Sequence, residues 1–243
     1  MCAAIAAAAA LALAGCFTSI ADDDGIAPGG GNEAPTPNDT ERDDGEYTGL
    51  VIENGVVTKC DSNATGHITI PEGVTGIGNR AFDGCHSLAS VTIPGSVKSI
   101  EGNAFLKCEN LASVTIGNGV ESIGVGAFNE CTSLASVTIP GSVKSIGDGA
   151  FARCTSLASV TIGDGVESIG NNAFNGCAIE SVEIPASVKS IGNGAFSVCN
   201  SLTNVKYGGT AEQWKDIVKG AIPFPYDVRI YDKEGKEITD TYL

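Results

Sequence analysis

The stretch SVTIPGSVKSIGDGAFARCTSLA, from Ser136 to Ala158, occurs six times in this chain with small changes. Aligned on the V-T-I core, the copies begin at Ile68, Val91, Val114, Val137, Val160 and Val182. Each copy has 23 residues except the fifth, which has 22. A fixed period of about 20 to 29 residues is typical of a leucine-rich-repeat solenoid, in which each repeat forms one turn. A single turn cannot bury its own apolar face, so the core forms between neighbouring turns.

One repeat shows how a turn is built. Val137 and Ile139 alternate with polar residues, which predicts a short strand with one apolar face. A Pro-Gly pair ends this strand, Val143 and Ile146 supply a second apolar pair, and two glycines relax the backbone for the next bend. The last apolar residues of the repeat recur at a three-residue spacing, which suits a 3₁₀ turn or a single helical turn; they are Phe151, Cys154 and Leu157.

Stacking places equivalent residues of successive turns in columns about 4.8 Å apart. One column holds the six phenylalanines Phe82, Phe105, Phe128, Phe151, Phe174 and Phe196. A second column holds the six cysteines Cys85, Cys108, Cys131, Cys154, Cys177 and Cys199. Both columns are predicted to lie in the core.

The cysteine column allows three interpretations. A zinc site needs four ligands that converge on one point, whereas each repeat supplies one cysteine at a time. Stacked cysteines are close enough in principle for disulfides. We favour the third interpretation, a ladder of small buried thiols, and therefore expect no metal and no cofactor.

Charge alternates with a period of two repeats. One position reads Thr75, Lys98, Glu121, Lys144, Glu167 and Lys189 down the six copies. The preceding turn alternates with it, because the sequences IPGS and IPAS accompany Lys while IGNG and IGDG accompany Glu. In-register stacking would place each Lys between Glu neighbours, at about 0.2 to 1 kcal/mol per exposed pair. We hypothesise that this charge ladder specifies register more than it adds stability.

The units ITIPEGVTGIGNRAFDGCHSLAS and VTIPGSVKSIGDGAFARCTSLAS resemble the BspA-like leucine-rich repeats of bacterial surface proteins. The resemblance covers about residues 46–220 and implies a β-rich, right-handed coil of short strands and 3₁₀ or helical turns. Two departures stand out: Glu101 replaces the usual Gly after Ile100, and the fifth unit lacks one residue around Cys177 to Ile179. We expect the strand to shift there.

Both ends of the repeat region, assigned to residues 68–204, carry sequences typical of caps. In the N-terminal cap (45–67), apolar runs flank Asn54-Gly55, which predicts a hairpin over Leu50 to Cys60. In the C-terminal cap (205–243), Thr210 and Gln213 have capping-box spacing, which predicts a short helix. We expect Trp214, Ile217 and Val218 to form the apolar face of that helix, and Asp227 to Thr239 to form a final hairpin.

The N-terminus reads as a targeting segment. The apolar run from Ala3 to Leu13 is shorter than the about 20 residues of a membrane span. It ends in LAGC, which resembles the lipobox of bacterial lipoproteins, although no Lys or Arg precedes the run. The resemblance implies a signal peptide over residues 1–15 and lipidation of Cys16, which places the protein in the bacterial envelope, at the outer membrane or cell surface. Residues 16–44 then form an acidic, disordered tether. The alternative is an Ala-rich stretch with a chance cysteine.

Composition argues against several other functions. The formal net charge of −15 disfavours nucleic acids and anionic lipid surfaces, because both require clustered cations. Contact with a membrane is thus expected only through the lipid anchor. The two histidines, His67 and His86, have no nucleophile and acid in a recognisable catalytic arrangement. We therefore predict that the protein is not an enzyme.

The surface of the strands remains as the candidate site. Residues that point away from the core form a regular array of hydroxyl groups with one carboxylate: Ser90, Thr92, Ser113, Thr115, Ser136, Thr138, Ser159, Thr161 and Glu183. The family resemblance implies adhesion, with host or matrix proteins as ligands. Two alternatives stay open, namely a spacer in the envelope without a dedicated ligand and a glycan-binding face. The array is equally compatible with a soluble strand face of good β propensity.

Overall fold

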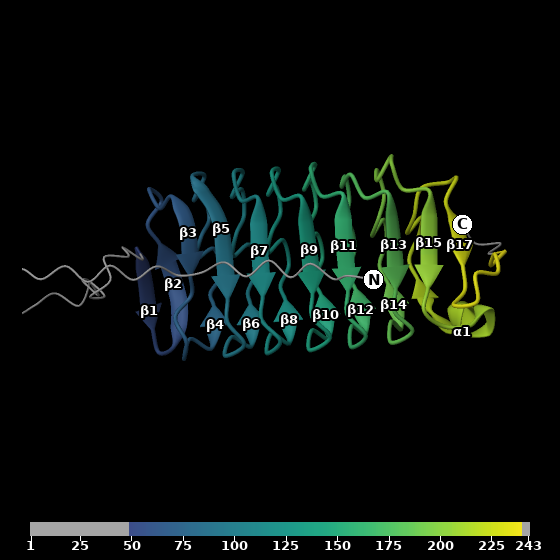
Figure 1. The fold of residues 1–243 in the computed structure, drawn as a ribbon, viewed down its shortest axis with the longest axis horizontal. Coiled ribbons are helices and arrows are strands. Elements are labelled where there is room, and N and C mark those ends of the chain that lie inside the picture. Colours follow the sequence, from purple (N-terminus) through teal and green to yellow (C-terminus); the bar gives the residue numbers. More distant parts are fainter. Residues whose placement is uncertain (1–48, 240–243) are drawn as a thin grey trace, which may run out of the picture. The chain divides into compact units, whose positions relative to one another are not determined.

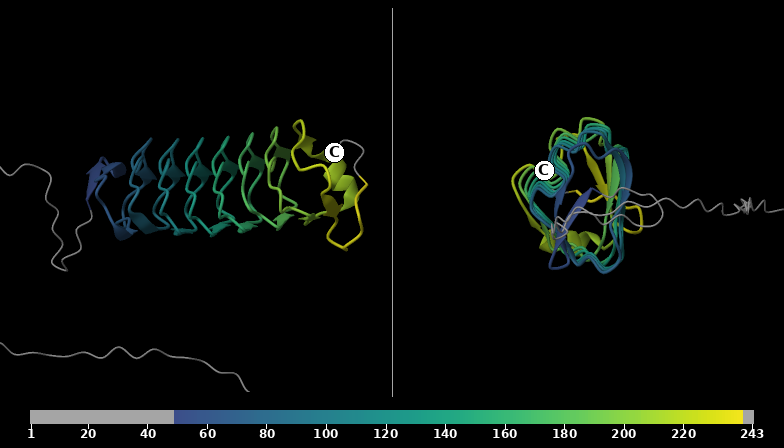
Figure 2. Two further views of the ribbon diagram at one scale, coloured as in Figure 1. Left: turned by 90° about the horizontal axis from the view of Figure 1, so that it is seen from above. Right: turned by 90° about the vertical axis from the view of Figure 1, so that its left-hand side faces the viewer.

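Residues 49–239 are described by a computed structural model, in which they form a β-solenoid of about eight stacked turns (Figure 1). The fold predicted from the repeat period is confirmed. Viewed along the solenoid axis, the turns superpose on one closed outline (Figure 2). The predicted signal peptide (1–15), Cys16 and the tether (16–44) lie outside the described residues.

The strands form three sheets. The short-strand sheet has nine strands: β1 (Leu50–Glu53), β2 (Val56–Cys60), β4 (Gly76–Ile77), β6 (Ser99–Ile100), β8 (Ser122–Ile123), β10 (Ser145–Ile146), β12 (Ser168–Ile169), β14 (Ser190–Ile191) and β16 (Val218–Lys219). The long-strand sheet has five: β3 (Gly66–Thr69), β5 (Leu88–Ile93), β7 (Ser113–Ile116), β9 (Ser136–Ile139) and β11 (Ser159–Ile162). The C-terminal sheet has three: β13 (Ser181–Ile184), β15 (Asn204–Tyr207) and β17 (Arg229–Tyr231).

Strand pairing within the repeats is parallel and in register. Val137 of β9 pairs with Val160 of β11, and Ser145 of β10 pairs with Ser168 of β12. In the long strands exposed and buried residues alternate, as the sequence pattern predicted. The valine and isoleucine of each strand therefore enter the core, while serine and threonine face outward.

On its third side, each repeat forms a series of tight bends of the backbone. Its backbone contains hydrogen bonds of the i to i+3 type that the three-residue spacing predicts, such as Cys154 N–H to Phe151 C=O. A continuous helix does not form, because Gly149 and Arg153 have φ near +60° and interrupt the right-handed path. The freed N–H groups bind the next turn instead, as Phe151 N–H donates to Ala173 C=O at 2.7 Å.

The core confirms both predicted columns. Each Phe ring stacks on the next, with centroids 4.5 to 5.3 Å apart from Phe82 to Phe196. The column continues to Phe224, which lies 5.2 Å from Phe196 and was not recognised in the sequence. The six predicted cysteines and Cys60 are buried as free thiols.

The missing residue of the fifth repeat has a visible effect. The short-strand sheet passes through this repeat without interruption, since β12 pairs with β14. The long-strand sheet ends at β11, and β13 belongs to the C-terminal sheet. The expected shift of the strand after Cys177 is thus a break in the ladder between β11 and β13.

The N-terminal hairpin is confirmed. Strands β1 and β2 pair antiparallel, and both turn residues, Asn54 and Gly55, have positive φ, as the favoured two-residue hairpin turn requires. Val56 and Val57 of β2 pair with β4, so the hairpin extends the short-strand sheet.

The C-terminal cap is confirmed in part. Helix α1 (Ala211–Asp216) begins with the predicted capping box of Thr210 and Gln213, and Trp214 is fully buried. The prediction for Val218 is wrong: it lies in β16, paired with β14, and is 70% exposed. The final hairpin is present in a short form: Tyr231 and Glu237 form an antiparallel bridge, and the N–H groups of Ile238 and Asp232 donate to the carbonyl oxygens of Ile230 and Lys236. The other edge of β17 pairs with β15.

Candidate binding surface

Eight of the nine predicted site residues lie on the outer face of the long-strand sheet. We call the side chains of Ser90, Thr92, Ser113, Thr115, Ser136, Thr138, Ser159 and Thr161 the hydroxyl face. They are exposed or half-buried, and in-register pairing aligns Ser90 with Ser113 and Ser136 with Ser159. Successive turns therefore repeat a pair of hydroxyl groups about every 4.8 Å along the axis.

Glu183 does not continue this ladder. It lies on β13 of the C-terminal sheet, beyond the break after β11. Its carboxylate forms an ion pair with Lys206 of β15 at 3.1 Å, and both side chains are about half exposed. The structure thus separates the predicted surface into a hydroxyl sector and a charged sector.

His67 closes the N-terminal end of the hydroxyl face. Its Nδ1 lies 2.7 Å from Ser90 Oγ, and its Nε2 lies 3.0 Å from Thr69 Oγ1. In a catalytic pair of a nucleophile and a histidine, a third group such as a carboxylate orients the imidazole through its second nitrogen. In this protein the second nitrogen of His67 contacts the hydroxyl group of Thr69 instead. The imidazole therefore organises neighbouring hydroxyl groups. The sequence analysis named His67 but did not recognise this cluster.

A second surface, missed in the sequence, is an open groove of about 580 Å³ over the short-strand sheet. Ser145, Ser168 and Ser190 line it, and the exposed side chains of Val125 and Val218 are also part of its lining. The signal in the sequence was the residue two positions after the isoleucine of β8, β10, β12 and β14, which reads Val125, Asp148, Asn171 and Asn193.

Three of these residues form a polar ladder beside the groove. Asn171 donates its backbone N–H to Asp148 Oδ1 at 2.7 Å and its side-chain amide to Asp148 Oδ2 at 3.0 Å. Asn193 N–H then donates to Asn171 Oδ1 at 2.8 Å, and Ala221 N–H donates to Asn193 Oδ1. These side chains therefore use their hydrogen bonds to join neighbouring turns.

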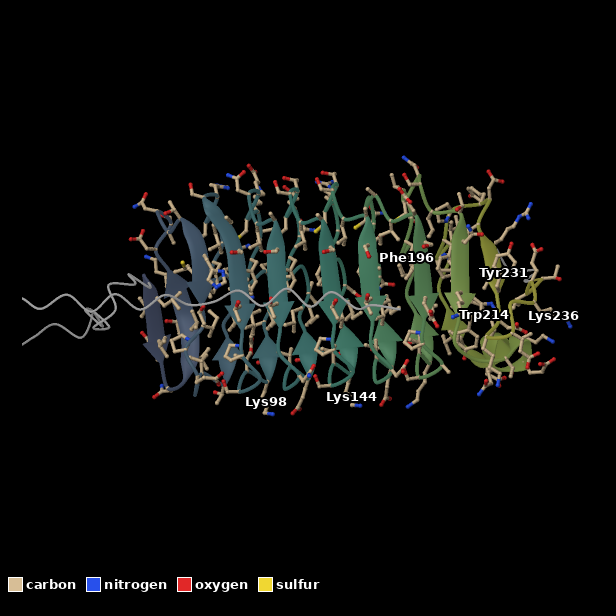
Figure 3. The ribbon with its side chains drawn as sticks, viewed as in Figure 1. Lys98, Lys144, Phe196, Trp214, Tyr231 and Lys236 are labelled. Atoms are coloured by element: carbon tan, nitrogen blue, oxygen red, sulfur yellow. The ribbon has the colours of Figure 1, made fainter. Side chains whose placement is uncertain are left out.

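The charge ladder is confirmed for two pairs. Lys98 Nζ lies 3.6 Å from Glu121, and Lys189 forms an ion pair with Glu167. Lys144 instead donates to Gly165 C=O at 3.5 Å. Lys189, with a smaller contribution from Lys144, lowers the pKa of the exposed Glu167 carboxyl. Lys98 and Lys144 extend from the same edge of the solenoid (Figure 3).

The buried thiols have a structural partner in each interior turn. Cys108, Cys131 and Cys154 donate to the carbonyl oxygens of Phe82, Phe105 and Phe128 at 3.1 to 3.2 Å. Burial raises the pKa of Cys154 to about 12 and that of Cys199 to about 11, so both are protonated at neutral pH. Within residues 49–239, no group of three or more His, Cys, Asp or Glu side chains could hold a metal ion.

Within residues 49–239, helix length and hydropathy fall short of what a membrane span requires.

Comparison with known families identifies the repeat. The sequence model of the BspA type Leucine rich repeat region matches in six copies, over residues 51–177 and 123–218. The chain belongs to this family. It is therefore a leucine-rich-repeat scaffold of the kind found in bacterial surface proteins. Among curated proteins, none matches this BspA-type chain.

The BspA-type chain is also similar to solved structures. A leucine-rich repeat protein of T. pallidum, TpLRR, is 31% identical with a TM-score of 0.60, over 68% of this chain and 77% of that protein. A leucine-rich cell surface protein of Faecalibacterium prausnitzii is 33% identical with a TM-score of 0.49, over 65% of this chain and 52% of that protein. The pneumococcal vaccine antigen PcpA shares the fold at 24% identity and a TM-score of 0.53, over 65% and 47%. This chain thus spans about half the length of the latter two proteins.

Proposed function

We propose that this BspA-type protein is a surface-exposed binding module without catalytic activity, and that the hydroxyl face binds an extended segment of a host or matrix protein. The observation that carries the proposal is the in-register sheet from β3 to β11, which aligns exposed serine and threonine side chains from turn to turn. A ligand that runs along the axis meets the same hydroxyl pair at every turn. A row of equivalent groups along the axis suits an extended ligand better than a small molecule, which requires a concave pocket.

The non-catalytic part of the proposal rests on the chemistry of the reactive groups. Both nitrogens of His67 contact hydroxyl groups, and burial raises the pKa of the thiols in the interior turns. An activated nucleophile requires a base held by a third group, or a thiol of lowered pKa beside a base. Among the described residues the thiol of lowered pKa is Cys85, which is buried beside a second thiol, Cys60. A solenoid of repeated structural turns instead presents its surface for binding.

We further propose that Cys16 is lipidated after removal of residues 1–15, and that the acidic segment 16–44 holds the solenoid away from the envelope. The proposal rests on the LAGC sequence at Leu13 to Cys16 and on family membership. Growth with a labelled fatty acid tests it: the wild-type protein should carry label, and Cys16→Ser should not. Label retained in the variant would contradict lipidation at Cys16.

The binding proposal is tested with a double variant of the hydroxyl face, Thr115→Trp with Thr138→Trp. The matched control is Glu121→Trp with Lys144→Trp, which changes two exposed corner residues of the same turns and leaves net charge unchanged. Immobilised wild-type protein and both variants are exposed to a panel of extracellular-matrix proteins and a panel of polysaccharides. We expect a matrix protein that the wild type and the control retain and that the face variant binds at least about tenfold more weakly, as expected when a central contact is blocked.

The two alternatives predict other outcomes of this experiment. Retention of a polysaccharide, lost in the face variant, would replace the protein ligand with a glycan. Absence of any ligand would favour an envelope spacer. Equal loss in the face variant and the control would show that binding does not use the hydroxyl face.

A further inference from the structure

The first two cysteines of the described residues, Cys60 and Cys85, differ from the cysteines of the interior turns. In the interior turns, each thiol donates to a phenylalanine carbonyl oxygen of the preceding turn, as Cys108 does to Phe82 and Cys131 to Phe105. The turn before Cys85 is the hairpin, which contains no phenylalanine. Cys85 Sγ lies instead 3.5 Å from Asp61 C=O, and Cys60 Sγ lies 3.5 Å from the same oxygen.

The two thiols also contact each other. A hydrogen bond joins Cys60 and Cys85, and both residues are buried, at 4% and 1% exposure. The backbone holds them in adjacent turns, since Cys60 N–H donates to Ala81 C=O at 2.6 Å. Cys60 therefore occupies the position of Phe82 in the preceding turn, and each of the two Sγ atoms lies 3.5 Å from the same Asp61 carbonyl oxygen.

We propose that Cys60 and Cys85 are a site of covalent modification, and that a small-molecule disulfide oxidant links them in an intrachain disulfide. The thiolate of Cys85 attacks one sulfur of the oxidant, which forms a mixed disulfide and releases one thiol of the oxidant. The thiolate of Cys60 then attacks the Cys85 sulfur and releases the second thiol. Two protein thiols are oxidised, the oxidant is reduced, and the two protein protons end on the two released thiols.

The environment of Cys85 favours the first step. The hydrogen bond from Cys60 lowers the pKa of Cys85, whereas the pKa of each of the other cysteines within residues 49–239 is raised. The pair also lies in the first turns of the described solenoid, where local opening costs less than in the interior. An oxidising surface location would preserve the bond, which would then tie the hairpin to the first repeat.

The sequence permits a direct test on the full chain. After incubation with oxidised glutathione, the free thiols are alkylated and the protein is cleaved with trypsin. Cleavage after Lys59, Arg80 and Lys98 places the two cysteines in the separate peptides Cys60–Arg80 and Ala81–Lys98. We expect these peptides to appear as one cross-linked species, with the loss of two thiols per chain among the seven described cysteines.

The interior of the column supplies the control. Cys108 and Cys131 share the tryptic peptide Cys108–Lys144, which should stay fully alkylated because both thiols are directed at carbonyl oxygens. The variant Cys85→Ser should form no cross-link, whereas Cys131→Ser should form it at the wild-type rate. Alkylation of both Cys60 and Cys85 after oxidation, or an equal yield of a link within Cys108–Lys144, would overturn the proposal.

A second readout keeps the proposal testable if a variant does not fold. In the wild-type protein, oxidation should slow amide hydrogen exchange of β1 and β2 by about tenfold, because a cross-link suppresses local opening of the end of the solenoid. Exchange in β8 and β10 should not change. Equal exchange of the hairpin in oxidised and reduced protein would show that no bond forms there.

Discussion

The two sheets of the repeat region respond differently to the same missing residue. The short-strand sheet continues from β12 to β14, whereas the long-strand sheet stops at β11. The deletion falls between Cys177 and Ile179, directly before β13, whereas β12 ends eight residues earlier, at Ile169. The phenylalanine column is equally undisturbed, since Phe174 and Phe196 stack at 5.1 Å. The core and the short strands therefore carry the continuity of the solenoid, and the long strands tolerate a local loss of pairing.

The largest expected effect comes from a substitution in the core, on which both sheets pack. Phe128 is fully buried between Phe105, at 4.9 Å, and Phe151, at 5.1 Å. Phe128→Ala should destabilise the domain by about 3–5 kcal/mol, because a cavity remains in a well-packed core. Denaturant unfolding measures the loss, and amide exchange should accelerate in both β7 and β8. Thr138→Ala on the exposed face should stay within about 0.5 kcal/mol of wild type. An unchanged melting temperature for Phe128→Ala would refute the packing of the column.

The next effect concerns the corner between the two sheets. A Cβ atom on Gly119 would lie 1.6 Å from Gly95 C=O, whereas a Cβ atom on Gly95 would come no closer than 3.8 Å to Gly119 N. Gly119→Ala should therefore cost about 1–3 kcal/mol, as overpacking does, and Gly95→Ala should be close to neutral. Thermal unfolding of the two variants compares them directly. Equal stability would mean that contact between turns does not explain the alternation of IPGS and IGNG.

A smaller effect is expected from an insertion that restores the missing residue of the fifth repeat. Insertion of one Ser between Ala178 and Ile179 restores the spacing found between Cys154 and Ser159. We expect β13 to pair with β11 and stability to rise by about 1 kcal/mol, the net value of a typical hydrogen bond. Slower amide exchange in Ser181–Ile184 reports the new pairing. The same insertion after Thr132, in a repeat of full length, should destabilise. No change in exchange at β13 would show that the missing residue is not the cause of the break.

The smallest effect tests register through charge. Glu121 pairs with Lys98 at 3.6 Å, and both side chains are more than half exposed. Glu121→Gln should cost about 0.2–1 kcal/mol, and Glu121→Lys should cost more because it places like charges on neighbouring turns. Urea unfolding of both variants provides the comparison. Equal effects would remove the idea that the ladder specifies register.

The success of the sequence analysis depended on how local each feature is. Asn54-Gly55 and the pair Thr210 and Gln213 specified their elements because the relevant hydrogen bonds span two or three residues. Val218 was assigned wrongly to a helix face because pairing of β16 with β14 competes with helical periodicity. Phe224 was missed because the residues around it, KGAIPFPY, do not contain the repeat motif. The hydroxyl face followed from alternation, but the organising role of His67 depends on a neighbour 23 residues away.

The sequence by itself determined the period of the coil, the columns that enter the core and the residues that begin and end the caps. Only the tertiary structure decided which strands pair across the fifth repeat, which glycines touch the turn before them, and which thiols face a carbonyl oxygen or another thiol. The reason is physical. Periodicity and capping act within a few residues along the chain, whereas these contacts join residues one full turn apart, and their distances depend on how closely whole turns can stack.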